Sequence, residues 1–243
     1  MTALISCLGA CSNIPSASPQ LFLAGDSTMS IKEENRRPET GWGEKLREKF
    51  RPPLSIHNHA KNGRSSKSFI NEGNWKQILL QLKPGDFVFI QFGHNDQKEG
   101  DPNRYTNPYS SYREYLRQYV DDTRSHHATP VLISSIVRRS FNDAGSLIDT
   151  HGPYPMVMRD LARELSVDFI DLNMLTERLI TSLGAERSKE YYLHVSPRHK
   201  NYHEGISDNT HLSPYGAEEI ATLVIVELCR INHPLKEYIN TCR

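Results

Sequence analysis

The chain has 243 residues, with 29 Lys and Arg against 29 Asp and Glu, so its formal net charge at pH 7 is zero. This balance excludes the strongly basic composition typical of a nucleic-acid-binding domain. No apolar run approaches the roughly 20 residues needed for a transmembrane helix, and the length suits one large domain with a sizeable core.

Residues 1–19 differ in character from the rest of the chain. Residues 2–11 are small and apolar, and residues 12–19 resemble a linker, which is typical of the later part of a secretory signal or of a disordered tail. Residues 8–11 also resemble a bacterial lipoprotein cleavage box, although no basic stretch precedes them, so Cys11 is a candidate lipid anchor. We therefore expect an exported protein (secreted, periplasmic or lipid-anchored) with its domain in residues 20–243.

Strands and helices alternate along that domain. The apolar run that ends in Gly25 is continuous, which predicts a strand buried on both faces. In chain order we expect a strand at about 20–25, a helix at 41–50, a strand at 54–59, a helix at 74–82, a strand at 87–92, a helix at 109–127, a strand at 130–137, a helix at 154–166, a strand at 167–171, and helices at 172–183 and 214–231. Such alternation favours parallel pairing through right-handed crossovers. The predicted fold is a three-layer α/β/α domain around a five-stranded parallel sheet.

The first strand ends in a Gly-Asp-Ser sequence that supplies a candidate nucleophile. Gly25 permits a sharp turn, and Ser27 follows the carboxyl end of the strand, where open α/β sheets place their ligands. Asp26 is expected to support the turn by hydrogen bonding. A serine hydroxyl is a weak nucleophile, so Ser27 needs a neighbouring base and donors for an oxyanion.

Two later strand ends offer such donors. Gly63 follows the second strand, and its backbone N–H can approach a ligand closely because no side chain intervenes. Asn95 follows the third strand, after the turn at Gly93, and presents an amide donor at the same sheet edge as Ser27. Taken alone, Gly63 is an ordinary turn glycine and Asn95 a loop residue in an Asx turn.

The base is predicted just before the last helix. Asp208 and His211 are three residues apart, so the carboxylate can reach the imidazole Nδ1–H and leave Nε2 free to face Ser27. A D-x-x-H pair alone has a competing explanation, in which Asp208 caps the helix and His211 packs on the surface.

Together the four blocks around these residues resemble those of the SGNH (GDSL-like) hydrolase family, which contribute Ser, Gly, Asn and His in this order. They match Ser27, Gly63, Asn95 and His211, with Asp208 completing a triad. The resemblance implies a flavodoxin-like α/β/α fold. The G-x-S-x-G turn of ordinary α/β-hydrolases is absent around Ser27.

The likeness extends over nearly all of residues 20–231 and is strongest to the rhamnogalacturonan acetylesterase branch. It rests on residues 24–29, 38–43, 58–69, 92–96 and 208–213. Asn209 stands where many members of the branch have Gly, which leaves the substrate open. The resemblance implies a secreted serine carbohydrate esterase that removes acetyl groups from rhamnogalacturonan or a related pectic polysaccharide or oligosaccharide, with no metal and no organic cofactor.

The resemblance also implies roles for individual groups. Ser27 attacks the acetyl carbonyl while His211 takes its proton, and Asp208 orients the imidazole. The backbone N–H groups of Ser27 and Gly63 and the side chain of Asn95 hold the oxyanion.

Three further residues are candidate substrate contacts. Arg64 can meet the carboxylates of galacturonate, Trp42 can stack on a sugar ring and His94 flanks the Asn95 donor, but each can equally be solvated or structural. The histidine-rich residues 194–203 form a conceivable metal site, yet no H-E-x-x-H pattern supports one, and a mobile loop bordering the cleft is the preferred interpretation.

Other functions stay open on the sequence alone. An acetylxylan esterase uses the same chemistry, whereas a lipase or thioesterase needs an acyl groove, and no long apolar stretch follows the blocks to line one. A non-catalytic glycan-binding protein does not need the Ser, Asn, Asp and His set, and a metallohydrolase would have to use residues 194–203. Cys229 and Cys242 are either a disulfide, which export would permit, or two unrelated thiols.

Overall fold

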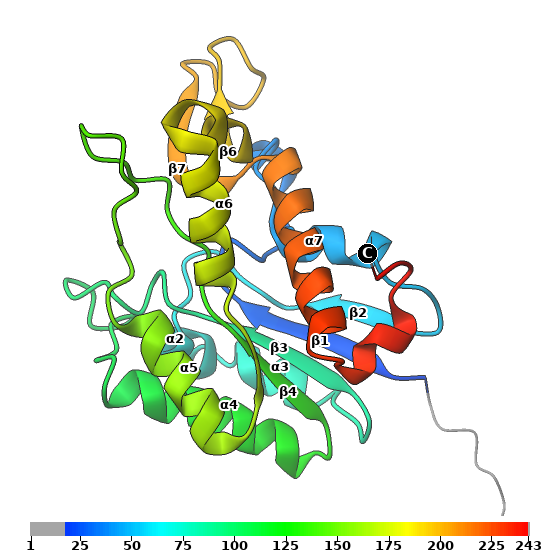
Figure 1. Cartoon of the computed structure of the whole chain (residues 1–243). Helices are drawn as coiled ribbons and strands as arrows, with labels where there is room; N and C mark the ends of the chain where they lie inside the picture. The colour runs from blue at the N-terminus through cyan, green and yellow to red at the C-terminus, as the bar shows by residue number, and fades with distance from the viewer. Residues whose placement is uncertain (1–17, 243) are drawn as a thin grey trace, which may run out of the picture.

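The computed structural model describes residues 18–242, so most of the suggested leader and the candidate lipid anchor Cys11 lie outside the described residues. A five-stranded sheet forms the centre of the domain (Figure 1). Its strands are β1 (Gln20–Gly25), β2 (Ser55–Asn58), β3 (Phe87–Gln91), β4 (Thr129–Ile133) and β5 (Asp168–Ile170). All neighbours pair in parallel, in the order β2-β1-β3-β4-β5. This is the order of flavodoxin-like sheets, and it confirms the predicted fold class.

Helices cover both faces of the sheet (Figure 1). They are α1 (Trp42–Lys45), α2 (Ser66–Asn71), α3 (Asn74–Leu79), α4 (Ser111–Ser125), α5 (Tyr154–Leu165), α6 (Leu172–Arg187) and α7 (Pro214–Arg230), with 3-10 turns at η1 (Glu34–Arg36), η2 (Leu46–Glu48), η3 (Ser188–Tyr191) and η4 (Pro234–Tyr238).

Strand β1 shows why the strands of this sheet have continuous apolar sequences. Leu21 and Leu23 join a buried cluster that includes side chains of α1, α6 and α7, whereas Phe22 and Ala24 join the cluster of α2, α3, α4 and α5. Successive side chains of a strand point to opposite faces, so a strand covered on both faces must be apolar at every position.

The sequence prediction is wrong at two of the helices. The helix expected at 41–50 is α-helical only to Lys45 and then continues as the 3-10 turn η2. The sequence prediction also missed α2, a short helix whose N-cap Ser65 accepts a hydrogen bond from the backbone N–H of Ser68. That helix begins only three residues after Gly63 and its serine-rich start has no apolar periodicity, which is why the pattern search passed over it.

The chain between α6 and α7 forms an antiparallel pair, β6 (Tyr192–Val195) and β7 (Ile206–Leu212), which the sequence prediction placed in loops. Near the C-terminus, Cys229 and Cys242 form a disulfide with a Cα–Cα distance of 5.8 Å. Across residues 18–242, none of the helices combines the length and apolar character that crossing a bilayer requires.

Candidate active site

The four blocks converge at the edge of the sheet where β1 and β3 lie side by side. β2 lies on one side of β1, whereas β3, β4 and β5 follow on the other side, so the strand order reverses between β1 and β3. Open α/β sheets bind their ligands at such a switch point, beyond the carboxyl ends of the strands. A cleft of about 420 Å³ opens at this edge. It is lined by Ser27, Arg36, Asn62, Gly63, His94, Asn95, Lys98, Arg138, Thr210 and His211.

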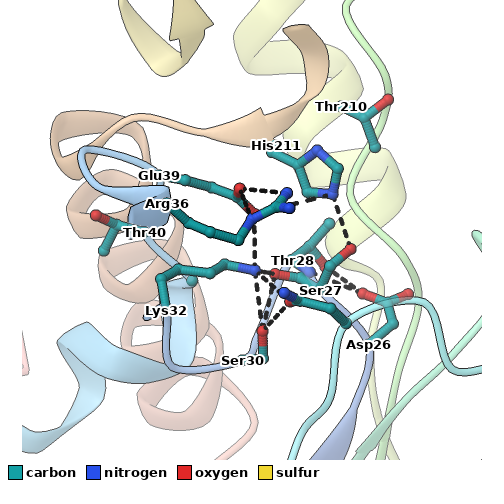
Figure 2. A network of polar contacts seen from close by, with 12 residues as sticks. Asp26, Ser27, Thr28, Ser30, Lys32, Arg36, Glu39, Thr40, Thr210 and His211 are labelled. Atoms are coloured by element: carbon teal, nitrogen blue, oxygen red, sulfur yellow. Dashed lines mark hydrogen bonds and ion pairs between the residues drawn. The ribbon is translucent and has the colours of Figure 1, made fainter. Parts of the chain in front are cut away.

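A hydroxyl, an imidazole and a carboxylate lie in series at the cleft. Ser27 Oγ is 3.0 Å from His211 Nε2, and His211 Nδ1 is 2.6 Å from Asp208 Oδ2. Since the carboxylate accepts the Nδ1–H, Nε2 is left to accept the Ser27 hydroxyl proton. Figure 2 shows His211 directed at Ser27 from the β7 side of the site.

Asp208 also fixes the local backbone. Its Oδ1 accepts hydrogen bonds from the backbone N–H groups of Thr210 (2.7 Å) and His211 (2.9 Å). Burial raises the pKa of this carboxyl, but the hydrogen bonds and the charge of His211 outweigh it and bring the pKa well below the ordinary value. Asp208 does not cap the last helix: Ser213 does, by accepting from the Gly216 N–H. The carboxylate is therefore ionised and committed to His211.

Asp26 supports the turn that carries the nucleophile, as its position predicts. It is fully buried, and its Oδ1 accepts from the backbone N–H and the hydroxyl of Thr28 at 2.9 and 2.8 Å. Its Oδ2 lies 3.2 Å from His94 Nδ1. Burial raises the pKa of Asp26, but the charge and hydrogen bond of His94 and the Thr28 hydrogen bonds lower it by more, so the net pKa lies below the ordinary value and the carboxylate remains charged.

The three residues predicted to donate to an oxyanion, Ser27, Gly63 and Asn95, all line the cleft. Gly63 has φ +76°, in the left-handed region that glycine adopts without strain. The Asn95 Nδ2 donates one hydrogen bond to the Arg64 carbonyl at 3.0 Å, which fixes the amide and leaves its second N–H. Within residues 18–242, the backbone N–H groups of Ser27 and Gly63 have no protein acceptor. Three N–H donors of cleft residues thus have no acceptor among the described residues.

A buried carboxylate ties the glycine block to the asparagine block. Asp96 accepts from the Ser66 N–H at 3.1 Å and from the Thr106 hydroxyl at 2.9 Å. Burial raises the pKa of Asp96 to about 7, against the lowering effect of these hydrogen bonds. The contact holds the first turn of α2, and with it the Gly63 loop, against the loop of Asn95.

The candidate substrate contacts fare differently. Trp42 is wrong as a sugar-stacking residue, because its ring is fully buried and its Nε1 donates to Gln91 at 3.1 Å. The Arg64 side chain pairs with Glu72 at 2.8 Å and does not line the cleft. His94 lines the cleft, but it is only 3% exposed.

Three cations in the cleft were missed by sequence reasoning. Arg36 ends the 3-10 turn η1, Lys98 and Arg138 lie in separate loops, and none of the three belongs to a motif. The only available signal was the position of Arg138, a few residues beyond the carboxyl end of β4.

The histidine-rich residues 194–203 pack beside the cleft, against residues 34–37. Asn201 donates to the Glu34 and Arg37 carbonyls at 2.7 Å, and Tyr202 donates to the Arg36 carbonyl at 2.8 Å. In the described part of the chain, no three His, Cys, Asp or Glu side chains gather as metal ligands do.

The chain is similar to known esterases over most of its length. A family model described as GDSL-like lipase/acylhydrolase matches residues 23–218. The rhamnogalacturonan acetylesterase RhgT of Bacillus subtilis is 41% identical, over 90% of this chain and 94% of the relative. A rhamnogalacturonan acetylesterase of Emericella nidulans is 27% identical, over 86% of this chain and 84% of the relative.

Solved structures agree on the fold. YxiM of Bacillus subtilis superposes with a TM-score of 0.74 at 24% identity, over 90% of this chain and 58% of that longer chain. Axe2, an acetylxylan esterase of Geobacillus stearothermophilus, has a TM-score of 0.60 at 18% identity, over 89% and 95% of the two chains.

Proposed function

The chain belongs to the GDSL-like lipase/acylhydrolase family and is a carbohydrate esterase, and from that premise we propose that it removes acetyl groups from rhamnogalacturonan through Ser27, His211 and Asp208. The observation that carries the mechanism is the 3.0 Å contact between Ser27 Oγ and His211 Nε2, beside three free N–H donors. A binding protein has no need of this alignment.

The geometry supports a two-step acyl transfer. Ser27 Oγ attacks the acetyl carbonyl carbon as its proton passes to His211 Nε2, and the negative charge on the carbonyl oxygen is held by the donors of Ser27, Gly63 and Asn95. The tetrahedral intermediate collapses to an acetyl-serine ester, and His211 returns the proton to the departing sugar oxygen. Water, deprotonated by His211, then attacks the ester and releases acetate and free Ser27.

The cleft charges support a pectic substrate. Arg138 donates to the carbonyls of Thr150 (3.1 Å) and His94 (3.2 Å), and within residues 18–242 it forms no ion pair with a carboxylate. Lys98 beside it is exposed, and Arg36 lines the same cleft. Galacturonate residues carry carboxylates that can pair with these cations, whereas a xylose residue offers none.

We expect acetate release from acetylated rhamnogalacturonan to exceed that from acetylated xylan. Substitution Arg138→Gln should lower kcat/KM on rhamnogalacturonan by roughly 10- to 150-fold, since a charge-assisted contact to a carboxylate contributes roughly 1.5–3 kcal/mol, and should leave hydrolysis of p-nitrophenyl acetate unchanged. Initial rates of acetate formation measure both.

The matched control is Arg113→Gln on α4, which removes a surface pair with Glu164 and does not touch the cleft. A higher kcat/KM on acetylated xylan, with no dependence on Arg138, would replace the pectic substrate by a xylan one.

We also infer export, as a secreted, periplasmic or Cys11-anchored protein. The Cys229–Cys242 disulfide supports it, because disulfides persist in oxidising compartments and are rare in the cytosol. Fractionation of cells that express the full chain should find it outside the cytoplasm with this disulfide formed, and a cytosolic pool with both thiols free would contradict the inference.

A further inference from the structure

A buried ion cluster lies beside the catalytic groups and has no role in the mechanism above. Lys32 and Glu39 have fully buried side chains, with Nζ and Oε1 2.9 Å apart. Arg36 completes the cluster through contacts of 2.9 and 2.8 Å from its Nε and guanidinium nitrogen to Glu39 Oε2. Figure 2 shows the three side chains directly next to Ser27 and His211. Burying two charges is expensive, so a purely structural pair would be replaceable by apolar residues.

Lys32 joins two parts of the active site. Its ammonium donates to the backbone carbonyl of Ser27, to Ser30 Oγ at 2.9 Å and to Asn62 Oδ1 at 2.7 Å. Asn62 precedes Gly63, so one cation links the turn of the nucleophile to the loop that supplies an oxyanion donor. A shift of about 1 Å between such groups can cost on the order of 100-fold in rate.

Glu39 faces the imidazole from the side opposite Asp208. Its Oε1 is 3.9 Å from His211 Nε2, too far for a hydrogen bond but close enough for a strong charge interaction. The position is fixed from the backbone, because the next residue, Thr40, donates its N–H to the Leu212 carbonyl at 3.1 Å.

The charge state of Glu39 follows from its neighbours. Burial raises the pKa of its carboxyl, but Lys32, His211 and Arg36 together bring the pKa below the ordinary value. The Glu39 carboxylate is therefore ionised in the resting enzyme. Its partner is the Lys32 ammonium, which also donates to the backbone carbonyl of Ser27.

We propose that Lys32 and Glu39 are positioning residues of the esterase: Lys32 holds the Ser27 turn and the Gly63 loop in register, and Glu39 anchors Lys32 and opposes the positive charge that His211 gains when it takes the serine proton. The proposal rests on the proposed Ser27–His211–Asp208 mechanism. It gives a function to the motif at residues 38–43, which the catalytic triad leaves unexplained.

The rate test uses Glu39→Gln, Lys32→Met and the double variant Lys32→Met/Glu39→Gln. We expect each to lower kcat by about 10- to 100-fold with KM changed little, because the groups act on alignment and developing charge rather than on substrate binding. Glu34→Gln is the matched control: Glu34 lies in the same segment, its side chain is 86% exposed, and among the described residues its carboxylate faces Arg37 at 3.9 Å and contacts neither Lys32 nor Glu39. Its kcat should stay within about twofold of the wild type.

The pH test separates positioning from packing. The imidazole of His211 is faced by Asp208 on β7, by Glu39 with Lys32 and Arg36 behind it, and by His94 after β3. Glu39→Gln removes a negative charge and leaves Lys32 uncompensated, so the acid limb of kcat/KM should move to lower pH. Lys32→Met removes a positive charge and should move that limb to higher pH. A packing defect has no reason to shift the two variants in opposite directions.

The outcomes are distinguishable. The single variants leave one buried charge unpaired and can unfold. The double variant removes both buried charges and leaves only the half-exposed Arg36 without its carboxylate partner, so it should fold with a near-normal thermal midpoint while kcat stays low. The proposal is overturned if the double variant folds and has wild-type kcat. It is also overturned if the acid limbs of the kcat/KM profiles of Glu39→Gln and Lys32→Met do not shift in opposite directions. Ser27→Ala in the same assays tests the mechanism itself. If Ser27→Ala retains activity, the proposed function is wrong. If Ser27→Ala is inactive but Glu39→Gln is fully active, the proposed function stands and only the positioning role is wrong.

Discussion

Replacing Ser27 by Ala is expected to reduce kcat for acetate release by about 10⁴- to 10⁶-fold, because among the described residues Ser27 carries the one hydroxyl that lies against His211 Nε2. The variant keeps the N–H donors of Ser27 and Gly63 and the amide of Asn95, so it should still bind acetylated oligosaccharide. Acetate formation under single-turnover conditions and binding by calorimetry measure the two properties separately. Loss of chemistry with retained binding is the pattern that a nucleophile predicts.

Ser182→Ala serves as the control, because Ser182 is an exposed residue of α6 whose hydroxyl only donates to the Leu179 carbonyl. Its activity should equal that of the wild type. A Ser27→Ala enzyme that released acetate at a tenth of the wild-type rate or faster would exclude an acyl-serine route, since general-base attack by water would then suffice.

The parallel sheet was predictable because a strand that is buried on both faces must be apolar at nearly every position. Strands β1 and β3 are apolar at nearly every position, and the carboxyl end of each is followed by a glycine turn and a polar block. Strand β7 was not predictable in the same way. It carries Asp208 and His211, its residues are mostly polar and half-exposed, and it pairs only with the four-residue β6, so neither alternation nor an apolar run marks it.

The same contrast divides the site. Ser27, Gly63, Asn95 and His211 could be named from the sequence because each follows a strand or precedes a helix, and because topology brings strand ends together. Arg138 and the Lys32–Glu39 pair could not, since they are isolated charges in irregular segments whose partners lie far along the chain. Trp42 shows the converse: the sequence leaves a tryptophan near the site open between sugar stacking and a structural role, and the structure buries its indole in the core with a hydrogen bond to Gln91.

Asp208→Asn is expected to lower kcat by about 10⁴-fold while the fold is kept. The asparagine is nearly isosteric, but its amide can donate toward Nδ1, which favours the imidazole tautomer that carries its proton on Nε2. In that tautomer His211 cannot accept the proton of Ser27. The imidazolium formed in the reaction also loses its ionised partner at 2.6 Å. Steady-state rates on acetylated oligosaccharide, beside the surface control Asp160→Asn on α5, measure the effect.

The same substitution should change how stability depends on pH. The pKa of Asp208 is depressed in the folded protein, so this carboxyl stabilises the fold above its ordinary value of 3.8 and loses that contribution as the pH falls through the folded value. The unfolding free energy of wild type should therefore exceed that of Asp208→Asn most at neutral pH, and the difference should shrink as the medium is acidified below pH 3.8. Urea unfolding of both proteins at several pH values tests the sign. A gap that is constant across this range would show that Asp208 is not held ionised by His211, and the tautomer argument would lose its electrostatic basis.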